Sequence, residues 1–137
     1  MKLLTKSIRD QLLRNGQIRA ALQEDGRAEA DFLPICKLFT PDAQCTWLLT
    51  ELDPIDPDIA FGLCDLGMQC PELGSVRISE LESVRGRLGL PVERDRHFVA
   101  RHTLSVYARA AWNEAAITEN PDALRQAVEA APEGGAS

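Results

Sequence analysis

Short apolar runs separated by turn signals fill residues 34–76, and they constrain the fold more than any other feature of the sequence. Two runs, 45–53 and 59–67, have the length of strands, and the loop between them contains two prolines. Proline fixes φ and cannot donate a hydrogen bond to a β-ladder, so these prolines favour a loop. Both faces of the first run are apolar near its middle, which predicts a central strand covered on both sides. Residues 34–76 therefore predict an antiparallel β-meander.

Helical patterns lie on both sides of this meander. Residues 5–15 and 17–24 predict two short N-terminal helices separated at Asn15-Gly16, and residues 103–117 predict the main C-terminal helix. Asn120 followed by Pro121 starts a weaker last helix. The expected fold class is therefore α+β, with a meander of three to five strands packed against N-terminal helices and a C-terminal helix.

The segment between the meander and the C-terminal helix gives two further expectations. Ser79 and Glu82 have the spacing of a capping box, which predicts a short helix from residue 79 to about residue 87. Residues 90–99 are expected to be extended, as an edge strand with alternating charge. We expect one domain over residues 1–131 and a disordered tail over residues 132–137.

The charges are unevenly distributed along the chain, whose formal net charge is −6. Residues 29–75 contain nine acids and one base, whereas residues 76–110 contain seven arginines and four acids. The molecule is therefore expected to be electrically polarised. The net negative charge argues against generic binding to nucleic acid or to an anionic membrane, both of which require a cationic surface.

The four cysteines contain no C-x-x-C pair. Because all four fall in or beside the predicted strands, we expect small hydrophobic side chains packed in the sheet; a zinc site is the alternative that we set aside. The sequence contains neither an apolar signal-peptide core nor an apolar run long enough to span a membrane. These features predict a cytoplasmic protein with reduced thiols, no metal and no cofactor.

Carboxylates concentrated around the loop between the two main strands are the strongest chemical signal. We expect four of them to form a partner-facing acidic rim: Glu51, Asp53, Asp56 and Asp58. Clustered carboxylates can also bind Mg²⁺ or Ca²⁺. However, a register that places Glu51 opposite Phe61 places Asp65 opposite Trp47, about 13 Å from Glu51 at the usual rise of a strand. That separation is too large for one metal ion.

Other catalytic arrangements are poorly matched. Pro41-Asp42 followed by Glu51-Leu-Asp53 resembles a nuclease core, but such a core needs lysine where Asp53 stands. His97 and His102 are expected to be polar surface residues. Three arginines form a weaker candidate anion-binding segment: Arg94, Arg96 and Arg101. For the arginines of residues 85–101 we favour pairing with nearby acids.

Several exact strings occur in order: Lys37-Leu-Phe-Thr-Pro-Asp42, Thr46-Trp-Leu-Leu-Thr-Glu-Leu-Asp-Pro54, Asp58-Ile-Ala-Phe-Gly-Leu-Cys-Asp-Leu-Gly67, Pro71-Glu-Leu-Gly74, Ser79-Glu-Leu81 and Leu88-Gly-Leu-Pro-Val-Glu-Arg-Asp95. With them the sequence resembles the bacterial domain-of-unknown-function family 2958 over about residues 2–108. The resemblance implies a setting on plasmids, conjugative elements and prophages, often near antirestriction genes. It supplies no catalytic residues.

These observations together favour binding over catalysis. The leading hypothesis is a non-enzymatic mobile-element protein, of antirestriction or anti-CRISPR type, whose acidic rim docks on a basic surface of a partner protein. The alternative is a small metal-dependent hydrolase that uses the same carboxylates. Direct nucleic-acid binding through the arginine segment is a weaker third possibility because the net charge opposes it.

Overall fold

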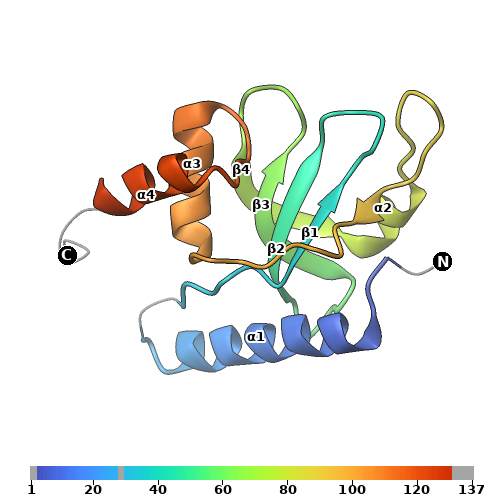
Figure 1. Cartoon of the computed structure of the whole chain (residues 1–137). Helices are drawn as coiled ribbons and strands as arrows, with labels where there is room; N and C mark the ends of the chain where they lie inside the picture. Colours follow the sequence, from blue (N-terminus) through green and yellow to red (C-terminus); the bar gives the residue numbers. More distant parts are fainter. Residues whose placement is uncertain (1–2, 28–29, 131–137) are drawn as a thin grey trace.

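The computed structural model describes residues 3–27 and 30–130, and within these residues a five-stranded antiparallel sheet forms the centre of the molecule (Figure 1). The strand order is β4-β3-β2-β1-β5. The strands are β1 (Cys36–Phe39), β2 (Thr46–Leu52), β3 (Ile59–Asp65), β4 (Glu72–Arg77) and β5 (Glu93–Arg94). The helices are α1 (Lys6–Glu24), α2 (Ile78–Ser83), α3 (Leu104–Glu114) and α4 (Pro121–Glu129). The predicted α+β meander is confirmed.

Helices pack on both faces of the sheet, so the protein has two hydrophobic cores. Leu49 of β2 belongs to the first core, with Leu12 of α1 and Leu81 of α2. Leu48 belongs to the second core, which α3 and α4 complete. Neighbouring residues of one strand point to opposite faces, so β2 is covered on both sides, as predicted. In Figure 1, α1 runs below the sheet, and α3 and α4 lie together at its left.

The N-terminal region is one helix, so the prediction of two helices is wrong. Thr5 caps α1 by accepting a hydrogen bond from the backbone N–H of Ile8 at 3.1 Å. The helix continues through Asn15 and Gly16, where the Asn15 amide donates to the carbonyl of Thr50 at 2.9 Å. A Cβ atom at Gly16 would lie 1.8 Å from the carbonyl oxygen of Leu52. The glycine therefore permits close packing of α1 on β2 and does not end the helix.

A β-bulge between Leu49 and Glu51 alters the predicted register. Glu51 lies opposite Phe61, as expected, but Asp65 lies opposite Thr46 and not opposite Trp47, because the bulge adds one residue to β2. Gly62 lies opposite Leu49 of this bulged strand. A Cβ atom at Gly62 would lie 1.9 Å from the carbonyl oxygen of Leu48, so the glycine makes room for the backbone of the bulged strand.

The predicted capping box at α2 is also wrong. Strand β4 runs directly into α2, so Arg77 is the N-cap residue and Ser79 is already helical. Glu82 does not reach back to Ser79; it accepts a hydrogen bond from the backbone N–H of Leu3 at 3.2 Å. The helix ends at Ser83 and not near residue 87, because the chain is extended at Val84. Within the predicted edge strand 90–99, β5 pairs with β1, and Pro91 forms an isolated antiparallel bridge with Arg85.

Two further expectations concern the ends of the chain and the membrane. The predicted tail over residues 132–137 lies outside the described residues. Within residues 3–27 and 30–130, no helix has both the length and the apolar character that crossing a bilayer requires.

The cysteines differ in environment, and for Cys70 the predicted burial is wrong. Cys36 is buried, Cys45 and Cys64 are half-buried, and Cys70 is exposed in the loop between β3 and β4. Burial raises the pKa of the Cys36 thiol to about 12, against a smaller opposing effect of Arg94. Burial also raises the pKa of Cys64, as does the nearby carboxylate of Glu72. Both shifts disfavour the reactive thiolate.

Brief treatment of the folded protein with iodoacetamide at pH 8 is therefore expected to label Cys70 first and to leave Cys36 unmodified. Peptide mass spectrometry after quenching gives the order of labelling, and the Cys70→Ser variant is the control that should lose the fast phase. Labelling of Cys36 at the rate of Cys70 would contradict the burial that the structure assigns.

Candidate functional site

The β2–β3 loop, residues 53–58, is held rigidly by its own aspartates. Oδ1 of Asp53 accepts a hydrogen bond from the N–H of Ile55 at 2.8 Å, and Oδ1 of Asp56 accepts one from the N–H of Asp58 at 3.3 Å. The N–H of Asp53 donates to the carbonyl of Ile59 at 2.9 Å, which closes the loop. Two prolines restrict the remaining backbone freedom. At the tip, Ile55 is 93% exposed.

Asp56 and Asp58 share one cation. Nη1 of Arg77 lies 3.1 Å from Oδ2 of Asp56 and 3.5 Å from Oδ2 of Asp58. Asp58 also accepts hydrogen bonds from the hydroxyl of Ser79 at 2.7 Å and from its backbone N–H at 2.9 Å. The bonds from Ser79, with Arg77 adding to them, hold the pKa of Asp58 below its ordinary value. The loop therefore presents three carboxylates against one guanidinium, and one of the three also anchors α2.

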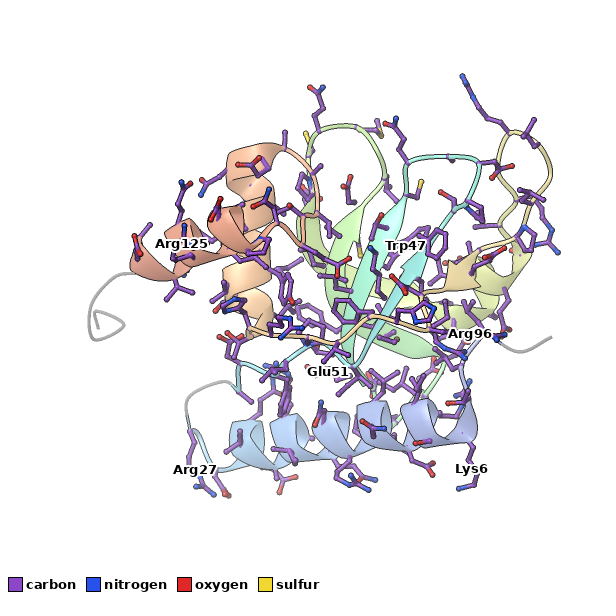
Figure 2. All side chains as sticks on the ribbon, in the orientation of Figure 1. Lys6, Arg27, Trp47, Glu51, Arg96 and Arg125 are labelled. Carbon is purple, nitrogen blue, oxygen red and sulfur yellow. The ribbon has the colours of Figure 1, made fainter. Side chains whose placement is uncertain are left out.

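Glu51 does not belong to this exposed rim, so its predicted place on the rim is wrong. It is 6% exposed, and Figure 2 shows it between the sheet and α1. Nε of Arg19 lies 2.6 Å from its Oε2, while the hydroxyl of Thr50 donates to its Oε1 at 3.3 Å. A carboxylate can be buried in this way because a cation and a hydrogen bond compensate its lost hydration.

Arg19 is fixed by further contacts, and the sequence reasoning missed it. Its Nη2 donates to the carbonyl of Ala30 at 2.9 Å. Its guanidinium carbon lies 5.6 Å from the ring centre of Phe32 and 5.9 Å from that of Phe61, within the range of cation–π attraction. The available signal was Glu51 itself, because an acid inside an otherwise apolar strand requires a cationic partner.

A pocket of about 430 Å³ lies between α1 and the β2–β3 loop. The lining of the pocket includes the Arg19–Glu51 ion pair and a third ionisable group, Asp53. Other polar side chains are Gln23 of α1 and Ser75 of β4. Its apolar part includes Ala20, Ile55, Ile59 and Phe61. The pocket thus adjoins the exposed tip of the loop, and Ile55 belongs to both.

Three further acids of residues 29–75, Asp31, Asp42 and Asp65, make hydrogen bonds that support the fold. Asp65 accepts hydrogen bonds from the N–H groups of Gly67 at 2.9 Å and Ile117 at 3.0 Å. Asp31 accepts one from the N–H of Ser105 at 3.1 Å, at the start of α3. Asp42 accepts one from the N–H of Leu88 at 2.6 Å. Each of these three aspartates therefore connects a segment near the sheet with a segment that is distant in the sequence.

The candidate anion-binding arginines do not form the expected ion pairs. Arg94 is half-buried, and its Nη1 donates to the carbonyl of Leu3 at 2.6 Å. Arg96 and Arg101 are exposed, and Figure 2 shows Arg96 on the side of the sheet away from α4. In the described part of the chain, none of the three lies within 4.0 Å of a carboxylate oxygen, so their predicted pairing with nearby acids is wrong.

Comparison with protein families matches residues 3–118 to the family described as "Protein of unknown function (DUF2958)". The chain belongs to the DUF2958 family. The match extends past residue 108, where we expected the resemblance to end, so the DUF2958 region includes α3 but stops before α4. It also includes the whole β2–β3 loop and the pocket beside it. No curated protein and no solved structure matches the chain.

The DUF2958 region offers little for the metal-dependent alternative. Among residues 3–27 and 30–130, no three side chains of histidine, cysteine, aspartate or glutamate are placed so that they could bind a metal ion together. The two carboxylates nearest the interior are already engaged: Glu51 by Arg19, and Asp65 by backbone N–H groups.

Proposed function

We propose that this protein is a non-enzymatic interaction protein that docks, through its β2–β3 loop, on a basic surface of a partner protein. The observation that carries the proposal is Ile55, an almost fully exposed apolar side chain at the tip of a rigid loop. Burial of this side chain against a partner would remove apolar surface from water, which favours association. A loop that is already rigid loses little conformational entropy when it binds, so more of the contact energy appears as affinity.

The charges around Ile55 determine which partner this loop would favour. Asp53, Asp56 and Asp58 surround the apolar tip, and Glu80 is exposed on the adjoining α2. Arg77 compensates only part of this charge. A basic partner surface would meet a complementary potential, which accelerates encounter and makes binding sensitive to salt.

The setting that we propose follows from the family resemblance. On a plasmid, conjugative element or prophage, a protein of this kind would act in the host cytoplasm. There the basic surfaces most relevant to the element are the nucleic-acid-binding faces of restriction or CRISPR components. Occupation of such a face by the acidic loop would exclude the nucleic acid by competing for the same cationic side chains.

The test uses variants that change charge and leave the loop intact. Asp53→Asn/Asp56→Asn retains the carbonyl oxygens that accept the loop's hydrogen bonds, and Ile55→Ser removes the apolar tip. The matched control, Glu114→Gln/Glu129→Gln, makes the same change in charge on α3 and α4. A partner captured from native host lysate is purified, and its affinity for each protein is measured by calorimetry at low and moderate salt.

We expect the double aspartate variant and Ile55→Ser each to bind roughly tenfold more weakly, which corresponds to about 1.4 kcal/mol. The aspartate variant should also show a smaller dependence on salt, whereas the control should bind like the unmodified protein. Equal affinity of all the proteins for the captured partner would refute docking through this loop.

A further inference from the structure

We propose that the pocket beside the β2–β3 loop receives a lysine or arginine side chain of the basic partner. This inference rests on the proposed function and specifies one of its contacts. The pocket, of about 430 Å³, is within the usual size range of ligand sites and is large enough for one long side chain with its flanking backbone.

The charges in the lining favour a cation over an anion. Glu51 and Arg19 neutralise each other, and Arg19 is also engaged with Ala30 and two aromatic rings. Asp53 remains as the uncompensated charge, so the three ionisable groups of the lining sum to about −1 by their usual ionisation states. An anionic ligand would be repelled by the carboxylates of Asp53 and Glu51. The cation that could attract it, Arg19, is already paired with Glu51.

Acceptor atoms in the pocket fit the donors of such a side chain. Oδ1 of Asp53 is used by the loop backbone, but its Oδ2 has no hydrogen-bond partner among the described residues. The side chains of Gln23 and Ser75 likewise make no hydrogen bond to the described part of the protein. An ammonium or guanidinium group donates in several directions, so it can bond to more than one acceptor of the lining.

The apolar lining fits the remainder of the side chain. Ile59 and Phe61 of β3 and Ala20 of α1 provide carbon surface for the methylene stem of lysine or arginine. Ile55 lines the pocket and also stands exposed at the loop tip. A partner that contacts Ile55 is therefore already beside the opening, so insertion of a neighbouring cationic side chain needs no separate approach.

Binding of single side chains is tested with three blocked amino acids of similar length. Nα-acetyl-lysine methylamide, Nα-acetyl-arginine methylamide and the uncharged Nα-acetyl-norleucine methylamide are titrated to millimolar concentration into the ¹⁵N-labelled protein. We expect the lysine or arginine probe to shift the amide signals of Gln23, Ile59 and Ser75 in a saturable way, and norleucine to leave them unchanged. The comparison of the two cationic probes identifies the preferred head group.

A pocket-filling variant links this result to the partner. In Ala20→Phe, the larger side chain occupies the pocket and leaves the loop's aspartates and Ile55 in place. In the control, Ala21→Phe, the same change is made at the next, exposed position of α1, which does not line the pocket. We expect Ala20→Phe to abolish the probe shifts and to lower the affinity for the captured partner roughly tenfold. Ala21→Phe should change neither the shifts nor the affinity.

The two proposals fail in different ways. If Ala20→Phe binds the partner normally while Ile55→Ser and the double aspartate variant do not, docking through the loop stands and side-chain insertion is wrong. If the cationic probes shift the pocket signals but the loop variants bind the partner normally, the pocket binds cations and the proposed docking function is wrong. The inference is also overturned if norleucine shifts the same signals as lysine.

Discussion

Replacement of Arg19 by methionine is expected to destabilise the fold by about 3–5 kcal/mol, the range for leaving one member of a buried ion pair without its partner. Methionine keeps an unbranched apolar stem between Phe32 and Phe61, so packing is largely preserved. What changes is the carboxylate of Glu51, which remains buried and loses the guanidinium 2.6 Å away. The difference in free energy of unfolding is measured by urea denaturation at pH 7.

A double-mutant cycle separates the ion pair from the other contacts of Arg19. Arg19→Met/Glu51→Leu removes both charges and should recover much of the lost stability, because an apolar pair replaces an orphaned charge. Lys6→Met is the control at an exposed ion pair, Lys6–Asp10, where we expect little change in stability because solvent screens exposed pairs. Simple additivity of the Arg19 and Glu51 single substitutions would show that the two side chains are not coupled.

Gly16→Ala is expected to destabilise the protein by about 3 kcal/mol or more, the upper part of the usual range for overpacking. A glycine-to-alanine substitution inside a helix usually increases stability, because alanine is favoured over glycine there by about 1 kcal/mol. At Gly16 we expect the opposite change. The added Cβ atom would lie 1.8 Å from the carbonyl oxygen of Leu52, so α1 must move away from β2. Thermal and urea unfolding followed by circular dichroism measure the loss.

Gly74→Ala is the matched control on the edge strand β4. A Cβ atom at Gly74 would have no atom within 4 Å, so this substitution should be neutral or slightly stabilising. An increase in stability of the Gly16→Ala variant equal to the usual helical preference would contradict the close contact between α1 and β2.

The strands were the part of the fold most easily predicted from the sequence. Strands β2 and β3 fall within the predicted runs 45–53 and 59–67, because proline- and aspartate-rich turns limit each apolar run. Local patterns failed where the decisive neighbour is distant in the sequence. The sequence around Gly16 is typical of a helix end. The role of this glycine in close packing becomes visible only from its distance to the carbonyl of Leu52, which is remote in the sequence. The bulge in β2 likewise has no local signal that distinguishes it from regular alternation.

The candidate site was predictable in part for the same reason. Asp53, Asp56 and Asp58 lie in the exposed loop where the turn residues placed them, although Asp56 and Asp58 share Arg77. Glu51 was misplaced because its partner, Arg19, is 32 positions away in the chain. The pocket could not be predicted at all, since it depends on how α1 crosses the end of the sheet.

The acids that tie distant segments to the sheet also bear on the order in which the protein folds. The hairpins of β2, β3 and β4 close short loops, which requires little chain entropy. The hydrogen bonds of Asp42 to Leu88, of Asp65 to Ile117 and of Asp31 to Ser105 span 46, 52 and 74 positions. Contacts between residues so far apart in the sequence form slowly during folding. We therefore expect the meander to gain protection from hydrogen exchange early in refolding, before the amides of Leu88, Ser105 and Ile117.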